Sequence, residues 1–289
     1  MSVDGNITLE VLKGCHDFDA SRRQVEAVVD QIASDPLAAL RFLAHYASWN
    51  GYFGAGVATL AGKIARSRAL FLDPGEPVVA LADRSVFVAS FFFDAARDEF
   101  DDGSTGHRDT HRCLAQAMVA GVLDFARGQG LIDGVDRVNG LLAAPDWLVE
   151  VEERVAVGYG ARSADDAGAI FSAMGYHLGS EVLADAEFSV IDHALSEKMP
   201  ALVKHLKAFK YVIGGQAHNG WHWLRTHSGH GGAVEEHHFE WAVEGVRRGF
   251  GYLSDGERAL ARRQVLDGFA RFGADHAAFF GRVGEEIGG

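Results

Sequence analysis

Helical periodicity is the feature of this sequence that most limits its fold. Through most of the chain, apolar residues recur every three or four positions, which is the spacing of amphipathic α-helices. Only five of the 289 residues are proline, the residue that interrupts helices most strongly. No convincing pair of alternating apolar and polar segments indicates a β-sheet. The sequence therefore predicts an all-α protein.

Several segments carry local signals for the start of a helix. Asp35 followed by Pro36 is a typical N-cap and first helical residue, and Ser254 with Glu257 forms a capping box. Ser21 and Gln24 have the same capping-box spacing. With the periodicity, these signals predict helices in the segments 21–34, 37–50, 51–71, 78–100, 107–128, 147–157, 167–195 and 233–250, a shorter helix that begins at Pro200, and a last helix from Ser254.

Two segments interrupt this pattern. Residues 131–162 are less regular, and we interpret them as an insertion within a single domain covering residues 1–289. Residues 214–232 contain six glycines and predict a loop or a distorted helix.

Composition and charge exclude several classes of protein. The formal net charge of −13 argues against a general nucleic-acid surface, which needs clustered Lys and Arg. No apolar run approaches the roughly 18 residues of a membrane helix, and the first residues lack the features of a signal peptide. The two cysteines, Cys15 and Cys113, suit a reducing compartment. We expect a cytoplasmic protein without nucleic-acid or membrane partners.

Histidines are concentrated near the C-terminal end of the chain. Six of the 14 lie between His218 and His238, and imidazole is a common ligand of iron and zinc. A solvated polar loop is the alternative explanation. Glu235 and His238 are three residues apart and share a helical face, which is the ligand spacing of helical di-iron carboxylate proteins.

A second acid and histidine flank the turn between two predicted helices. Glu99 ends the first helix and His111 lies in the first turns of the next, so antiparallel packing would bring them together. An acid at the C-terminal end of a helix opposes the helix dipole, which argues against a purely structural role. His107 is one helical turn before His111 and remains the alternative.

A third candidate lies in the middle of a predicted helix. Glu181 shares a face with His177, Leu178 and Met174, and a carboxylate among apolar side chains is costly unless it is paired or bound to metal. Glu187 is the alternative, about 240° further round the helix.

Taken together, three segments resemble the heme-oxygenase-like di-iron oxidases, also called the iron-containing redox enzyme family. They are DEFDDGSTGHRDTHRCLAQAM (98–118), GYHLGSEVLADAEF (175–188) and HGGAVEEHHFEWAV (230–243), and the resemblance covers roughly residues 80–250. It implies a heme-oxygenase-like helical bundle of about seven or more helices. It also implies the metal ligands Glu99, His111, Glu181, Glu235 and His238.

The sixth ligand is where the chain departs from the family. The family has a histidine seven residues before the last one, and here that residue is Gly231. His230 is one position away, and His227 is the alternative. On a straight helix His230 and His238 would diverge by about 80°, so we expect the backbone between His227 and Val234 to depart from regular α-helix.

The resemblance implies two Fe(II) ions and O2 as co-substrate. Members oxidise small amine, amino-acid or fatty-acid substrates by N-oxygenation, C–C cleavage or decarboxylation, often in natural-product biosynthesis. Three alternatives remain: a thiaminase-like enzyme using Cys113, a heme-handling protein using His16 or His45, and a non-catalytic metal-binding protein. The expected partners are a small-molecule substrate and, if the chain dimerises, a second copy of it.

Overall fold

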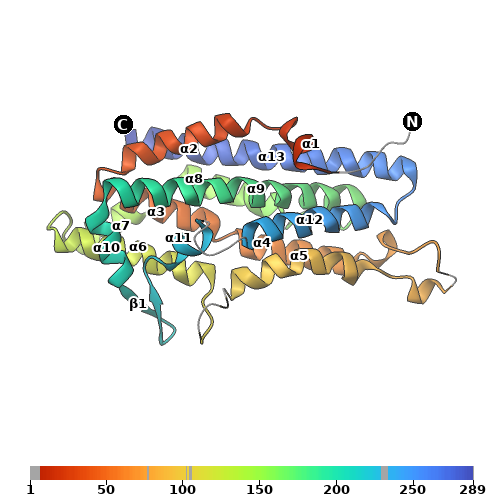
Figure 1. Ribbon diagram of the computed structural model, residues 1–289, viewed down its shortest axis with the longest axis horizontal. Helices are drawn as coiled ribbons and strands as arrows, with labels where there is room; N and C mark the ends of the chain where they lie inside the picture. Colours follow the sequence, from red (N-terminus) through yellow and green to blue (C-terminus); the bar gives the residue numbers. More distant parts are fainter. Residues whose placement is uncertain (1–6, 77, 102, 104–105, 229–233, 289) are drawn as a thin grey trace.

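Long α-helices lying side by side make up most of the molecule (Figure 1). The computed structural model describes residues 7–76, 78–101, 103, 106–228 and 234–288. The predicted all-α fold class is confirmed. In chain order the helices are α1 (Leu9–Lys13), α2 (Phe18–Ile32), α3 (Pro36–Asn50), α4 (Phe53–Arg66), α5 (Ser85–Phe100), α6 (His111–Gly128), α7 (Val135–Leu142), α8 (Asp146–Gly158), α9 (Ala167–Lys198), α10 (Pro200–Ala208), α11 (His222–His227), α12 (Val234–Phe250) and α13 (Asp255–Gly288).

Helix α9 is the centre of the bundle. Its apolar residues are buried on more than one face, as expected for a helix surrounded by others. Helices α2 and α13 pack on one side of it and α12 on the other, and α12 in turn packs on α5 (Figure 1). Each of these neighbours can therefore direct side chains towards those of α9.

Glycines allow α9 and α13 to approach closely. A Cβ atom on Gly175 would overlap the backbone carbonyl of Val265, and one on Gly268 would overlap that of Ser172. The two longest helices therefore touch backbone to backbone, which fixes their relative position along the bundle.

The predicted helix starts are partly correct. The side chain of Asp35 caps α3 by accepting a hydrogen bond from Leu37 N at 2.8 Å, and Glu257 accepts one from Ser254 N at 2.9 Å. The capping box at Ser21 is wrong, because α2 begins at Phe18 and its N-cap is Asp17. Ser21 is instead buried inside α2.

Two helices near the candidate site begin later than predicted. Helix α5 starts at Ser85, because Asp83 accepts a hydrogen bond from Ser85 N at 2.9 Å, and residues before it form a short 3₁₀ turn (Val79–Leu81). Helix α6 starts at His111, since the Thr110 hydroxyl caps it by accepting from Cys113 N at 3.0 Å. His107 therefore lies in the connecting loop.

The glycine-rich stretch 214–232, for which we predicted a loop or a distorted helix, contains the turn and second strand of a β-hairpin, followed by helix α11. Strands β1 (Lys210–Ile213) and β2 (Gln216–Asn219) pair antiparallel. The two residues between them, Gly214 and Gly215, have φ values of 59° and 82°. Two positive φ values suit the tight turns that connect hairpin strands, and glycine adopts them without strain.

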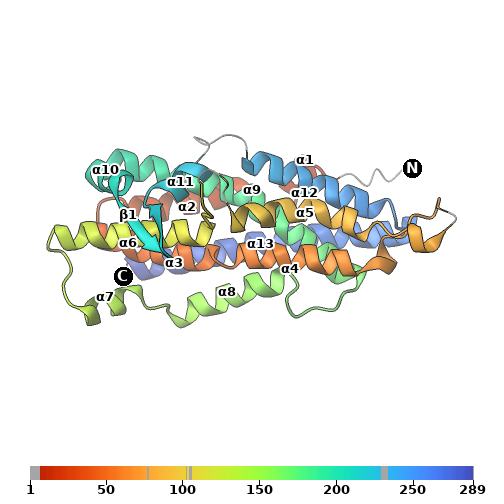
Figure 2. The ribbon, with the colours of Figure 1, turned by 90° about the horizontal axis from the view of Figure 1, so that it is seen from below.

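The irregular stretch 131–162 is helical as well. Helices α7 and α8 lie along one side of the bundle (Figure 2). Leu148, Val151 and Val155 of α8 belong to the main hydrophobic core, so much of this stretch packs with the rest of the chain. That residues 1–289 form a single domain stays a prediction.

Candidate metal centre

Four helices bring polar side chains to one cavity of about 200 Å³. Glu99 comes from α5, His111 from α6, Glu181 from α9 and His238 from α12. The structure thus brings together four of the six ligands that the sequence predicted. Their role as metal ligands stays a prediction.

Glu99 and His111 form one pair in this cavity. Their Oε2 and Nδ1 atoms are 3.2 Å apart, across the turn that joins α5 to α6. Gly54 of α4 makes room for the acid, because a Cβ atom there would lie 2.9 Å from the Cβ of Glu99. The expected antiparallel approach of the two helices therefore occurs.

Glu181 lies between two histidines. Its Oε1 is 3.4 Å from Nδ1 of His177, one turn earlier on α9, and its Oε2 is 3.7 Å from Nδ1 of His238. The Glu181 side chain is 11% exposed and His238 is 7% exposed, so both are largely removed from water. A carboxylate in this setting needs compensating charge, from a protonated imidazole or from a cation.

Asp98 is hydrogen-bonded to the other nitrogen of the His238 ring. Nε2 of His238 donates to Oδ2 of Asp98 at 2.9 Å. Burial raises the pKa of Asp98, but the hydrogen bonds and charges of His238 and Arg97 together lower it more, so the net pKa lies below the usual value. An ionised Asp98 fixes the proton on Nε2, so in the neutral ring the lone pair is on Nδ1, facing Glu181.

His227, the alternative candidate for the sixth ligand, lines the same cavity. Its Nδ1 donates to the carbonyl oxygen of Trp223 at 2.8 Å. The neutral ring therefore has its lone pair on Nε2. The rings of His227 and His111 meet edge to face with centroids 4.4 Å apart.

The wall of the cavity includes a buried tyrosine. The Tyr159 hydroxyl is 2.8 Å from Oγ of Ser180. Burial raises the pKa of Tyr159 well above its usual value, and the hydrogen bond with Ser180 lowers it by less. The nearby charges of Glu181 and Glu99 raise the pKa further. Tyr159 is therefore a neutral phenol in the cavity wall.

The alternatives Glu187 and His107 lie elsewhere. Glu187 faces away from the cavity, where Tyr46 donates to its Oε2 at 2.7 Å and His276 Nε2 lies 2.7 Å from its Oε1. His107 contacts Asp109, with 3.3 Å between Nε2 and Oδ1. Within the described residues, the geometry thus favours Glu181 over Glu187 and His111 over His107.

Two predicted ligands cannot be placed. His230 and the side chain of Glu235 lie outside the described residues. Helix α11 ends at His227. The expected departure from regular α-helix before Val234 falls on residues 229–233, which lie outside the described residues, so it stays a prediction.

The donor set fits a transition-metal ion. Two glutamates and several imidazoles supply oxygen and nitrogen donors, which suit iron and zinc, and they come from different helices around one cavity. These residues would hold the metal, and Asp98 would orient one of them.

Sequence reasoning did not select Asp98 or His177 as site residues. His177 is four residues before Glu181, and this spacing on one helical face was the available signal. Asp98 is adjacent to Glu99 in an acidic helix end, and nothing local distinguishes it from the other acids there.

Comparisons with known proteins do not identify the chain. No protein-family model and no curated protein matches its sequence. The chain is similar to the crystal structure of a CADD-like protein of unknown function from Nostoc punctiforme. The identity is 15% and the TM-score 0.44, over 94% of this chain and 98% of that chain. Similarity of this degree does not establish a shared function, so the function must be inferred from the residues of the cavity.

Within the described parts of the chain, no helix has both the length and the apolar character needed to cross a membrane.

Proposed function

We propose that the chain is a non-heme di-iron oxidase or oxygenase that uses O2 to oxidise a small molecule in the cytoplasm. One observation carries the proposal: Glu99, His111, Glu181 and His238 line one cavity from four different helices. Side chains this far apart in sequence line one cavity, and carboxylates there need a positive charge beside them, from an imidazole or from a cation. Two metal ions bound by carboxylates and imidazoles in a helical bundle are one way to meet this requirement.

The alternative functions, heme handling and a thiaminase-like reaction, account for fewer of the cavity residues. His16 contacts Ser21 and His45 contacts Glu286, and within the described chain neither histidine lines the cavity. A heme ligand at either position would leave Glu99 and Glu181 without a role. Cys113 likewise does not line the cavity, which argues against a thiaminase-like nucleophile at this site.

The chain's own residues would bind the metal, orient the metal ligands and exclude water. Bound iron would supply electrons to O2. Asp98 keeps the proton of His238 on Nε2. Phe53, Phe188 and Trp223 line the cavity and limit the entry of water.

The size of the cavity restricts the substrate. About 200 Å³ is below the roughly 300–1,000 Å³ typical of sites for drug-sized ligands. A compact molecule, such as an amino acid or a small amine, suits this space. A fatty-acid-like substrate would enter only with its reactive end. N-oxygenation, C–C cleavage and decarboxylation are the outcomes we propose to test.

Oxygen uptake tests the proposal. The full chain is loaded with Fe(II) under anaerobic conditions, O2 is added, and its consumption is followed with and without a panel of amines, amino acids and short fatty acids. We expect iron-dependent uptake that Glu181→Ala abolishes. Glu197→Ala is the matched control, because Glu197 is on the same helix and its side chain is 66% exposed. Bound iron with no uptake under any condition would instead indicate a non-catalytic metal-binding protein.

A further inference from the structure

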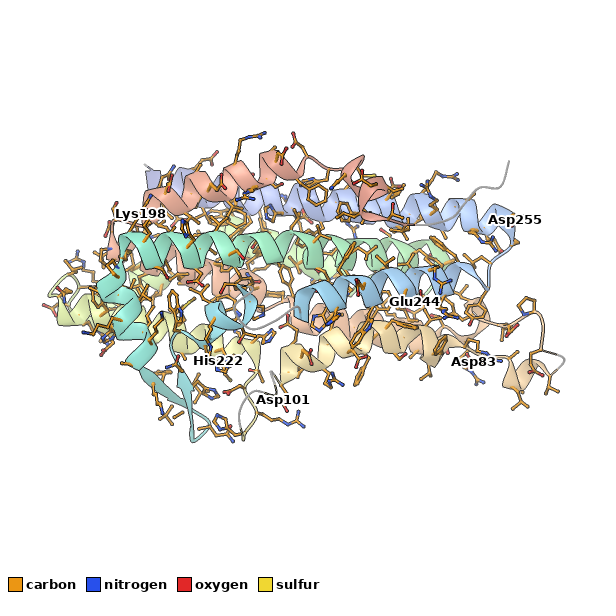
Figure 3. All side chains as sticks on the ribbon, viewed as in Figure 1. Asp83, Asp101, Lys198, His222, Glu244 and Asp255 are labelled. Atoms are coloured by element: carbon orange, nitrogen blue, oxygen red, sulfur yellow. The ribbon has the colours of Figure 1, made fainter. Side chains whose placement is uncertain are left out.

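A second group of metal-ligating side chains lies outside the cavity. His107 and Asp109 belong to the loop before α6, and His218 belongs to β2. One ligand atom from each residue lies within 4.8 Å of the other two. The loop and hairpin are on the side of the bundle that also holds Asp101, just past α5, and His222, at the start of α11 (Figure 3). The proposed iron centre uses none of the three residues.

Both imidazoles approach the same carboxylate oxygen. Nδ1 of His218 is hydrogen-bonded to Oδ1 of Asp109, and Nε2 of His107 lies 3.3 Å from that oxygen. The two rings are nearly perpendicular, with centroids 5.5 Å apart. Two nitrogens and one oxygen thus point into one small volume.

The separation of 3.3 Å between His107 and Asp109 is close to that between two ligands of a bound ion. Zinc bonds of about 2.1 Å at tetrahedral angles place neighbouring ligand atoms roughly 3.4 Å apart. Small side-chain movements would bring the three donors to that spacing. Imidazole and carboxylate donors suit zinc and related transition metals, whereas Mg²⁺ prefers oxygen ligands.

Burial of the carboxylate favours the binding of a cation by these three residues. The side chains of Asp109 and His218 are each 2% exposed, while His107 is 32% exposed. A buried carboxylate is stabilised by a positive charge beside it. The exposed edge at His107 offers an entry path from solvent to the two buried donors.

We propose that His107, Asp109 and His218 bind one divalent zinc-class ion, separate from the iron centre. The ion has three protein ligands, and water completes the fourth position. On binding, it replaces the hydrogen bond between His218 and Asp109. It ties the β-hairpin to the loop that leads into α6, the helix that carries His111. The site therefore stabilises the hairpin and the first turn of α6.

Zinc binding by the full-length chain tests this proposal. The cavity is first disabled by Glu181→Ala together with His238→Ala, and Zn(II) bound per chain is measured after equilibrium dialysis. We expect about one zinc, and at least ten-fold weaker binding when His107→Ala is added. Because His107 is partly exposed, this change does not disturb the core. His205→Ala is the matched control, since His205 is 31% exposed and lies 3.1 Å from Asp124.

Hydrogen exchange gives a second readout. Zinc should slow amide exchange in residues 210–219 of the otherwise unchanged chain, and it should not do so in His107→Ala. Excess Mg²⁺ should not displace the zinc. Three results would overturn the proposal: no zinc bound by the cavity-disabled chain, equal zinc affinity with and without His107→Ala, or amide exchange that zinc does not change. Asp109 and His218 would then be a hydrogen-bonded pair only. Failure of the iron centre is a separate outcome, because one zinc would still bind.

Discussion

Asp98 on α5 accepts a hydrogen bond at 2.9 Å from Nε2 of His238 on α12, 140 residues later in the chain. The contact orients the imidazole so that Nδ1 faces Glu181. Groups that orient a metal ligand in this way commonly contribute about 10- to 100-fold to metal affinity. We therefore expect Asp98→Asn to weaken iron binding by about that factor while the helical content stays unchanged, as measured by anaerobic titration and circular dichroism.

The control for this variant is Asp94→Asn. Asp94 lies one turn earlier on α5 and pairs with the exposed Arg97 at 3.1 Å. Its loss should leave iron affinity unchanged. Equal affinity in the Asp98→Asn variant and the parent chain would show that Asp98 does not support the site.

Gly54→Ala should disturb the site through Glu99. The added methyl group would lie 2.9 Å from Cβ and 3.3 Å from Oε2 of Glu99, so the acid must move. Displacing a group at a reaction centre by about 1 Å can cost up to about 100-fold in rate. We expect a loss of this order in iron-dependent oxygen uptake.

Gly62→Ala is the matched change for Gly54→Ala. Gly62 is on the same helix, and the nearest atom to its added Cβ is Nη1 of Arg66 at 3.9 Å. Alanine there should retain full uptake and stabilise the protein by up to about 1 kcal/mol. Equal uptake by the two variants would contradict the close packing of Gly54 on Glu99.

Gly268→Ala should destabilise the fold and not the site alone. The methyl group would overlap the backbone carbonyl of Ser172 where α13 crosses α9, and backbone cannot move aside as a side chain can. Overpacking of this kind costs about 1–3 kcal/mol, occasionally more. Urea unfolding should show a loss of at least this size. Gly256→Ala, in the same helix with open space around the added atom, should show none.

The ion pair of Asp165 predicts a stability effect that depends on pH. Hydrogen bonds from Arg66 and Lys63 lower the pKa of Asp165 from 3.8 to about 2. A lowered folded-state pKa means that the stabilisation is complete above the ordinary value and is lost as the pH falls through about 2. Asp165→Asn should therefore unfold at lower urea than the parent at pH 7. The difference should shrink between about pH 4 and pH 2; a constant difference would show that the carboxylate charge is not responsible.

Much of the fold could be predicted because its signals are local. Helix α12 follows from periodicity, and the start of α3 follows from an N-cap and proline. The start of α5 was missed because the apolar pattern was extended back to residue 78, whereas the helix begins at Ser85, whose backbone N–H donates to the side chain of Asp83. The hairpin was missed because its strands have only four residues each and little alternation.

The residues of the site could be predicted only where their positions in the sequence follow a recognisable pattern. Glu99, His111, Glu181 and His238 were identified from helical faces and the order of segments. The contacts of Asp98 with His238 and of Asp109 with His218 join residues more than 100 positions apart. Such contacts depend on how the helices pack, and a single sequence contains no local signal for them.

Iron content tests the account most directly. The measurement is Fe(II) bound per chain after anaerobic loading and removal of free metal, made in the His107→Ala background so that the hairpin group does not contribute. We predict close to two Fe(II) per chain, and the loss of at least one when Glu181→Ala is added. Full iron loading of the Glu181→Ala chain, or no iron in its parent, would contradict the assignment of this cavity as a di-iron centre.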